Sequence, residues 1–185
     1  AVIITNGGSN KTKYNFLSYF ARSRFDIANK YAITLSIRRD GSSRFGKDSQ
    51  FGWFPAASAA WTVSNERFLS NSRFLSTLKI RGSWGITGNA EIGNFASQNL
   101  YGLTSYDRRI GVSPIQLGDP DLKWERTKQY DFGVDYGLFN NFLTGEVDYY
   151  KKTTNDLLFN QPLPGTSGFT SIVRNVGEMV NEGIE

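Results

Sequence analysis

The chain has 185 residues, which is long enough for one ordinary domain with a hydrophobic core. It contains no cysteine and no histidine, which excludes disulfides, thiolate or histidine metal sites, and the Ser-His-Asp and Cys-His catalytic arrangements. The net charge of +4 comes from 21 basic and 17 acidic residues without a run of five basic ones, so nucleic acid is not an expected partner.

The main pattern in the first part of the chain is an alternation of apolar and polar residues. Apolar side chains occupy odd positions from Leu17 to Ile27, interrupted by Ser23, and again from Tyr31 to Ile37. A period of two residues indicates β-strands with one apolar face. The short connector "ANK" between these runs predicts a β-hairpin.

The same alternation returns in later segments. It occurs in residues 53–63, 78–89, 128–138 and 142–152, and more weakly in residues 171–185. These runs bring the number of predicted strands to seven. The pair "NN" at positions 140 and 141 predicts a tight turn between two of them.

The connectors between these runs alternate between short and long. The long connectors cover roughly residues 40–51, 89–123 and 154–170, and are rich in Gly, Ser, Asn, Asp and Pro. This composition predicts loops. The connector over residues 64–77 allows one helical turn, with Ser64 or Asn65 as the N-cap.

Antiparallel strands with one apolar face suit two architectures. In a soluble sandwich the apolar face is buried, whereas in a transmembrane barrel it meets lipid and the polar face lines a lumen. Here the polar face consists mainly of Asp, Gly, Ser, Thr and Arg, aromatic residues occur near strand ends, and the connectors alternate in length. These three features favour the barrel.

Several consecutive motifs carry a resemblance to one family. They are "RRDGSSRFG", "WFPAASAAWTVSNERFL", "LKIRGSWGITGN", "WERTKQYDFGVDYGLFNNFLTGEVDYYKKTTNDLL", "PLPGTSGF" and "NVGEMVNEGIE", in this order. Together they resemble the SusC/RagA family of TonB-dependent outer-membrane transporters from about Tyr14 to Glu185. The resemblance implies an all-β, antiparallel transmembrane β-barrel, of which this chain supplies about seven of roughly 22 strands.

The resemblance also implies a function and a set of partners. Members of the family sit in the bacterial outer membrane and import oligosaccharides or peptides, with energy delivered through TonB. A SusD-like surface lipoprotein covers the barrel, and we expect a dimer of transporter–lipoprotein pairs surrounded by outer-membrane lipid. Transport needs no covalent chemistry, so we expect no catalytic residue, cofactor or metal. Two alternatives are a soluble carbohydrate-binding β-sandwich and an outer-membrane barrel enzyme.

Residues 1–185 resemble only the barrel part of such a transporter. We expect the plug domain and the TonB box to lie outside this segment, and the chain to be a piece of a longer protein. Seven strands cannot close a wide barrel, and open strand edges leave backbone groups unsatisfied in lipid. We therefore expect neighbouring strands to complete the fold.

The stretch "RRDGSSRFG" is a candidate rim motif. We expect a strand to end near Arg38, and we expect Asp40 and Gly41 to turn the chain outward. Arg38, Arg39 and Arg44 should pair with lumen or loop carboxylates. Backbone N–H groups and Arg44 could instead hold phosphate. The spacing is not that of a P-loop, so the structural role is favoured.

A set of charged residues falls on the polar face of adjacent predicted strands. Its members are Lys79, Arg81, Asp131, Asp135, Glu146 and Asp148. Carboxylates in such proximity could act as a pair in glycoside cleavage. Ion pairs of the four acids with basic residues such as Lys79 and Arg81 in the lining of a lumen are the preferred interpretation.

Four aromatic residues in or beside the long connectors are candidates for contact with substrate or lid: Tyr101, Tyr106, Trp124 and Phe169. Aromatic rings can stack on sugar rings or on peptide side chains. They can equally pack one loop against another.

Overall fold

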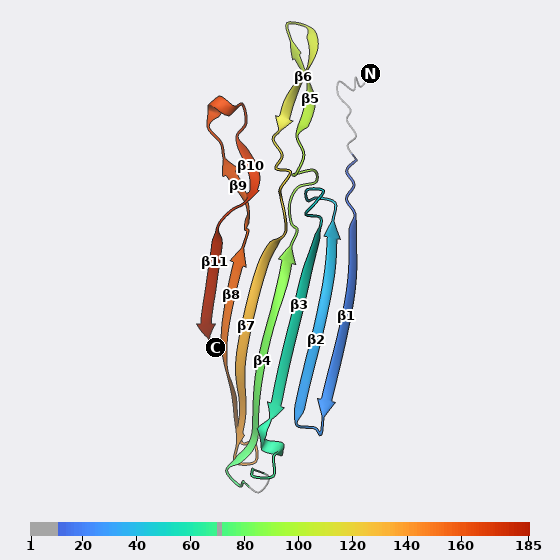
Figure 1. Cartoon of the computed structure of the whole chain (residues 1–185). Helices are drawn as coiled ribbons and strands as arrows, with labels where there is room; N and C mark the ends of the chain where they lie inside the picture. Colours follow the sequence, from blue (N-terminus) through green and yellow to red (C-terminus); the bar gives the residue numbers. More distant parts are fainter. Residues whose placement is uncertain (1–10, 70–71) are drawn as a thin grey trace, which may run out of the picture.

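Residues 11–69 and 72–185 are described by the computed structural model, and among them one long antiparallel sheet dominates (Figure 1). Seven strands form this sheet in the order β1-β2-β3-β4-β7-β8-β11. Their bounds are Phe16–Ile27 (β1), Tyr31–Ser42 (β2), Phe51–Thr62 (β3), Leu75–Asn89 (β4), Glu125–Leu138 (β7), Leu143–Asn155 (β8) and Glu178–Ile184 (β11). The predicted all-β fold is confirmed.

Two smaller hairpins stand beyond the end of the sheet where the long connectors leave it (Figure 1). They consist of β5 (Leu100–Tyr106) with β6 (Arg109–Gln116), and of β9 (Leu158–Pro162) with β10 (Ser171–Asn175). The prediction of loops throughout residues 89–123 and 154–170 is therefore wrong. The weak run over residues 171–185 is also divided, because β10 belongs to a hairpin and only β11 joins the long sheet.

Tight turns form at the opposite end of the sheet, as predicted. Ala28 and Asn29 connect β1 to β2 with φ of 52° and 55°, and Asn140 and Asn141 connect β7 to β8 with φ of 56° and 62°. Asparagine enters this left-handed region more readily than most residues that have a side chain. The Asn residues therefore help to make both turns short.

The connectors also contain two short 3₁₀ turns, η1 (Val63–Asn65) and η2 (Gly165–Ser167). The first is the single helical turn allowed between β3 and β4. Its N-cap is Thr62, without a capping hydrogen bond from a side chain, so the prediction of Ser64 or Asn65 as the cap is wrong.

The strand register gathers apolar side chains on one face of the sheet. Ile33, Ala59, Gly82, Phe132 and Tyr149 lie opposite one another in a single row across five strands. Ile33, Phe132 and Tyr149 remain 37, 53 and 44% exposed, and no second layer of the described residues covers them. A soluble sandwich would bury this apolar face, so that alternative is not realised.

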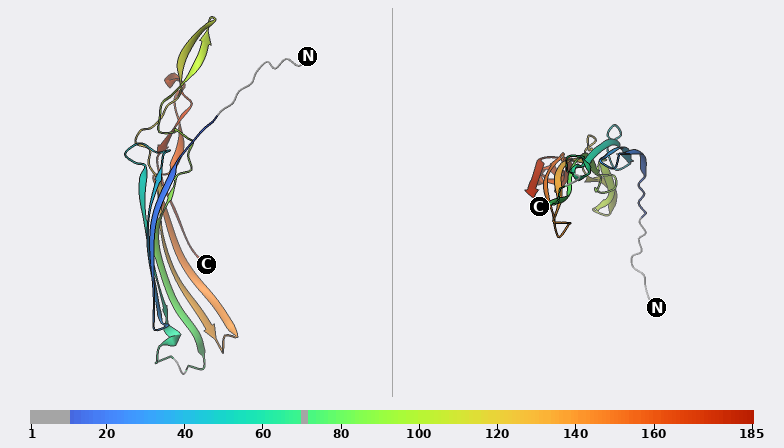
Figure 2. Two further views of the ribbon diagram at one scale, coloured as in Figure 1. Left: turned by 90° about the vertical axis from the view of Figure 1, so that its right-hand side faces the viewer. Right: turned by 90° about the horizontal axis from the view of Figure 1, so that it is seen from below.

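The sheet is curved and open (Figure 2), and β1 and β11 form its two edges. An uncovered apolar face on a curved antiparallel sheet fits contact with lipid, provided that further strands complete the barrel. No helix within the described residues is long and apolar enough to cross a membrane.

Candidate functional site

Arg81 is the centre of an ion-pair network on the polar face. Its Nε donates to Asp135 Oδ1 at 2.9 Å, and its Nη2 lies 2.6 Å from Asp148 Oδ2 and 3.2 Å from Glu146 Oε2. Lys79 Nζ adds a contact of 3.3 Å to Asp135 Oδ2. The network joins three neighbouring strands, β4, β7 and β8.

A glycine makes this reach across three strands possible. Gly133 lies between Arg81 and Asp148 in the register, on the intervening strand β7. A Cβ atom at Gly133 would lie 2.2 Å from Asp148 Oδ1 and 2.8 Å from Arg81 Cζ. Because Gly133 has no side chain, the charged groups of Arg81 and Asp148 have space to meet above it. The alternation of apolar and polar residues in the sequence does not predict this role of Gly133.

Asp131 differs from the other three acids. It accepts hydrogen bonds from Ser83 Oγ at 2.9 Å and from Gln129 Nε2 at 2.8 Å, but forms no ion pair with a described residue. The expectation that all four acids pair with basic residues is wrong for Asp131. No group of three or more Asp or Glu residues among those described could hold a metal ion.

The polar face is hollowed beside this network. A concavity of about 380 Å³ is lined by residues of β1 to β4 and β7, among them Arg22, Arg24, Arg81 and Asp131. The surface combines cations, carboxylates and hydroxyl groups, and so can bind and exchange water or polar solutes.

The rim motif is built differently from the prediction. β2 continues to Ser42, so the strand does not end near Arg38. Asp40 lies within the strand and does not turn the chain. Arg38 does pair with a carboxylate, that of Asp40, at 2.6 Å, and the Asp40 side chain is only 4% exposed. Gly41 lies opposite Phe51, whose Cε1 would be 2.5 Å from a Cβ at Gly41.

Arg39 and Arg44 form no ion pair with a described carboxylate, which corrects the second part of the prediction. The Arg39 guanidinium lies 4.3 Å from the centre of the Phe51 ring, and its Nε is buried without a hydrogen-bond partner among the described residues. Arg44 donates to Asn94 Oδ1 at 3.0 Å and to the Ala90 carbonyl at 3.3 Å, and lies over the Tyr14 ring.

A small hydrophobic core joins the long connectors at the end of the sheet. Its buried members are Phe45, Phe54, Ala90, Ala96, Leu122 and Trp124. Gly46 N donates to the Leu122 carbonyl at 3.2 Å, and Trp124 Nε1 donates to the Gln50 carbonyl at 3.0 Å. These contacts hold together two connectors that are far apart in the sequence. We call the six buried residues the loop core.

The four aromatic candidates separate into different environments. Trp124 is 5% exposed, with its ring 4.9 Å from Phe45 and 5.3 Å from Phe54, so it packs within the loop core and cannot contact a substrate from there. Tyr101 is 65% exposed on β5. Tyr106 ends β5, and its side chain lies outside the described part of the molecule.

Phe169 lines a cleft of about 400 Å³ between the β6 end of one hairpin and the β10 side of the other. Ile115, Gln116, Asn160 and Ile172 also line this cleft. Apolar and amide groups thus occur together in it. Sequence reasoning did not find these four neighbours, because they come from connectors far apart in the chain.

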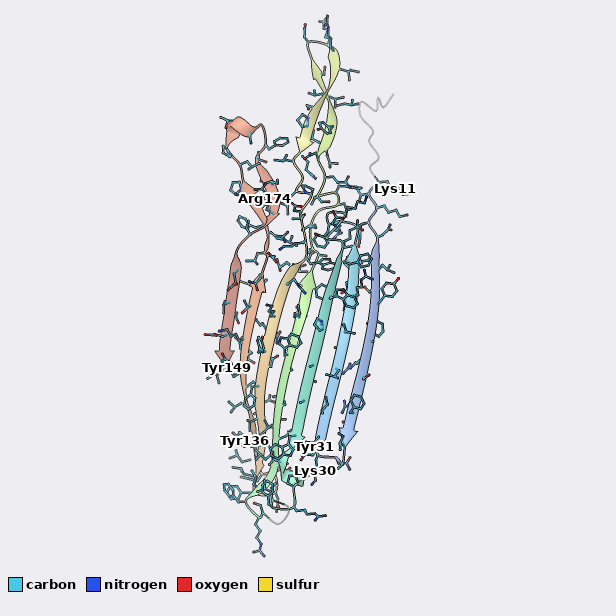
Figure 3. All side chains as sticks on the ribbon, viewed as in Figure 1. Lys11, Lys30, Tyr31, Tyr136, Tyr149 and Arg174 are labelled. Carbon is cyan, nitrogen blue, oxygen red and sulfur yellow. The ribbon has the colours of Figure 1, made fainter. Side chains whose placement is uncertain are left out.

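Glu66 organises the opposite end of the sheet, where Lys30 and Tyr31 lie (Figure 3). Lys30 Nζ is 2.7 Å from the Glu66 carboxylate, and Tyr31 Oη and Trp61 Nε1 donate to it at 2.8 and 3.3 Å. The hydrogen bonds from Lys30 and then Tyr31 lower the pKa of Glu66 below its ordinary value. The carboxylate pins the β3–β4 connector to the first hairpin.

Together these features define a class of protein. The chain has an uncovered apolar face, a polar face with a charge network, short turns at one end, and long structured connectors at the other. This is the wall of an outer-membrane β-barrel.

Comparison with known proteins gives the family. A family model described as "TonB dependent receptor-like, beta-barrel" matches residues 3–185. The chain belongs to this family of outer-membrane proteins, and to its SusC/RagA group, as the motifs predict.

Two curated relatives and one solved complex show how far the similarity extends. TonB-dependent receptor P39 of Formosa agariphila is 45% identical over 96% of this chain, and TonB-dependent receptor SusC of Bacteroides thetaiotaomicron is 37% identical over 94%. The RagAB peptide importer in its "closed-closed" state is 41% identical over 92% of the chain, with a TM-score of 0.87. The TM-score to its "open-open" state is 0.84.

The chain covers only part of each of these proteins. It spans 17% of receptor P39, 18% of SusC and 19% of the matched chain of the RagAB importer.

Proposed function

We propose that this chain is a section of barrel wall in a transporter that imports oligosaccharides or peptides across the outer membrane, with energy supplied through TonB. The observation that carries the proposal is the match of the seven-stranded wall to the RagAB peptide importer, at 41% identity and a TM-score of 0.87. The polar face would form part of the lumen and the apolar face would meet lipid.

The charged residues of the polar face have a role in this proposal. Lys79, Arg81, Asp135, Glu146 and Asp148 line the lumen as an ion-pair network of two cations and three carboxylates, and Asp131 lines it through hydrogen bonds from uncharged side chains. Because each carboxylate has a partner within the wall, we assign these residues to the lining of the lumen and expect transport without covalent chemistry.

At the mouth, the rim residues and the loop core fix the shape of the opening. Arg38 pairs with Asp40 near the end of β2, and Gly41 leaves room for the Phe51 ring. Arg44 ties its connector to residues 90–94. Tyr101 and Phe169 remain candidates for contact with substrate or lid, because one is exposed and the other lines a cleft.

The proposed partners follow from the relatives. The RagAB importer, as its name indicates, has two kinds of component, which supports a SusD-like surface lipoprotein as the lid of this transporter. The plug domain and TonB box would belong to the rest of the protein, and a dimer of transporter–lipoprotein pairs would be the assembly.

The test is uptake by cells that lack the complete gene. Fluorescent oligosaccharides and peptides are offered to the deletion strain, the parent strain and a complemented strain. We expect the deletion to abolish uptake of at least one oligosaccharide or peptide, complementation to restore it, and a protonophore to abolish it again. Unchanged uptake of every compound in the deletion strain would contradict the proposal.

A further inference from the structure

The charged side chains on the apolar face are confined to the end of the sheet near the long connectors. Alternate positions of β2, β7 and β8 are uncharged along most of each strand, and Arg39, Arg126, Lys128 and Lys151 occupy the corresponding positions close to that end. The edge strand β11 adds Glu178 and Glu182. The apolar face therefore ends in a band of charge.

Three of these cations have no carboxylate partner among the described residues. Lys151 pairs with Glu182 at 2.8 Å, but Arg39, Arg126 and Lys128 form no such pair. Their cross-strand neighbours are uncharged: Tyr19 and Trp53 for Arg39, Gly88 and Asn155 for Arg126, and Ile86 and Thr153 for Lys128. We call Arg39, Arg126 and Lys128 the basic edge.

Aromatic residues hold part of the basic edge in place. The Arg39 guanidinium lies 4.3 Å from the Phe51 ring centre and 5.5 Å from that of Trp53. Arg126 Nη2 donates to the Trp53 carbonyl at 3.1 Å. Both arginines therefore contact Trp53, and guanidinium groups fixed in this way can bind an anion at a smaller cost in side-chain entropy.

The depth of the basic edge matches that of lipid headgroups. Arg39 follows Tyr31 by eight positions on β2, and Lys128 precedes Tyr136 by eight on β7; Figure 3 shows both tyrosines near the opposite end of the sheet. Eight residues span about 27 Å along a strand. A tilt of about 40° reduces this to about 20 Å, close to the apolar band of roughly 25 Å in outer-membrane barrels.

We infer that the basic edge binds the phosphate groups of anionic lipids in the leaflet on the side of the long connectors. Arginine and lysine form charge-assisted hydrogen bonds with phosphate, and each cation near an anionic surface adds to the attraction. The three cations lie at the boundary of a face that meets lipid, where the phosphate groups of lipid headgroups are the nearest anions. A lipid phosphate is therefore the expected ligand. This inference does not depend on which substrate the protein imports.

The experiment measures lipid retention by native mass spectrometry on the full-length transporter. The probes are bisphosphorylated lipid A and the same lipid after chemical dephosphorylation. The variant Arg39→Gln/Arg126→Gln/Lys128→Gln removes the basic edge. A matched control, Arg22→Gln/Arg24→Gln/Lys152→Gln, removes three positive charges from the polar face.

We expect the basic-edge variant to bind bisphosphorylated lipid A about tenfold or more weakly than the parent protein, with the control unchanged. Equal binding of both probes by the parent, equal binding by parent and variant, or equal loss in the control would overturn the inference. Displacement of the lipid by excess inorganic phosphate would also overturn it, because free phosphate would then be the ligand.

A charge-preserving variant guards against a folding defect. If the triple Gln variant does not form a heat-modifiable barrel, Lys128→Gln alone is compared with Lys128→Arg, because the neighbours of Lys128 are the uncharged Ile86 and Thr153. Weaker lipid binding in the Gln variant, together with parental binding in the Arg variant, supports the inference. Parental binding in both contradicts it.

Discussion

At the scale of single residues, the absence of a side chain can matter as much as a charge. The ion pair between Arg81 and Asp148 crosses β7 at Gly133, where no Cβ stands in the way. Gly82 lies on the opposite face of the next strand, and a Cβ there would meet only the Asp131 carbonyl at 3.8 Å. Two glycines on paired strands therefore differ in what they permit.

We predict that Gly133→Val destabilises the full-length barrel by about 1–3 kcal/mol, because the new side chain overpacks the space where Arg81 and Asp148 meet. The measurement is the midpoint temperature of heat-modifiable mobility in gel electrophoresis. Gly82→Val serves as the control and should leave the midpoint close to the parent value. An equal shift in both variants would show that the crossing at Gly133 is unimportant.

We predict that Trp124→Ala loosens the loop core without disrupting the sheet. The Trp124 ring contacts Phe45 and Phe54, and truncation of a buried aromatic residue typically costs about 3–5 kcal/mol. The connectors over residues 43–50 and 117–124 should become sensitive to limited proteolysis of the folded barrel. Tyr101→Ala, at an exposed position, should leave the cleavage pattern unchanged; proteolysis of both variants at the same rate would refute the role of the core.

At the scale of elements, the two ends of the sheet are built by different means. Short turns with left-handed residues close the hairpins at one end, and Glu66 holds the longer β3–β4 connector against them through Lys30, Tyr31 and Trp61. At the other end, aromatic packing in the loop core and the hydrogen bonds of Arg44 to Asn94 and to the Ala90 carbonyl fix the connectors.

The contacts of Glu66 should make the β3–β4 connector sensitive to acid. Since the pKa of Glu66 is lowered in the folded protein, its contribution is fully present above the unfolded value of about 4.3 and is lost as the pH falls through the folded pKa. We expect hydrogen-exchange protection factors of residues 63–66 to fall in that acid range while those of the central strands persist.

Glu66→Gln tests this origin of the acid sensitivity. The variant should show reduced protection of residues 63–66 at neutral pH and little further loss in acid, because the titrating carboxyl group is gone. Asp48→Asn, in a connector at the other end of the sheet, should behave like the parent. An acid-dependent loss of the same size in Glu66→Gln would assign the titration to another group.

At the scale of the whole molecule, the described strands form a wall with two open edges and an apolar face that no other described segment covers. Large side chains on this face, such as Phe25, Phe132 and Val180, are 52, 53 and 49% exposed. In water this surface drives association, and in lipid the edges leave backbone groups without partners. The wall therefore depends on the remaining strands of the barrel.

We predict that residues 1–185, produced alone, aggregate or misfold. Size-exclusion chromatography without detergent should give no monomer peak, and circular dichroism should show no cooperative melting. The full-length transporter in detergent is the comparison and should melt cooperatively. A soluble, monomeric and cooperatively melting fragment would contradict the dependence of the wall on further strands.

The sequence by itself determined the strands of the long sheet, the tight turns and the family. A period of two residues persists along β1, β2, β7 and β8 because each strand separates lipid from a polar interior. Successive side chains point to opposite faces, so neighbouring residues must alternate between apolar and polar types. The motifs, in their order, identified the SusC/RagA group, and the pairing of Arg81 with Asp135, Glu146 and Asp148 could be anticipated from adjacent strands.

Only the tertiary structure decided how distant connectors meet. Nothing local in "DGSSRFG" or "DPDLKW" indicates that Phe45 packs on Trp124, or that Arg39 lies on aromatic rings instead of pairing with an acid. The hairpins β5–β6 and β9–β10 also lay hidden in segments whose composition predicts loops. These features depend on contacts between residues far apart in the chain. The alternation of apolar and polar residues depends only on which face of its own strand each side chain occupies.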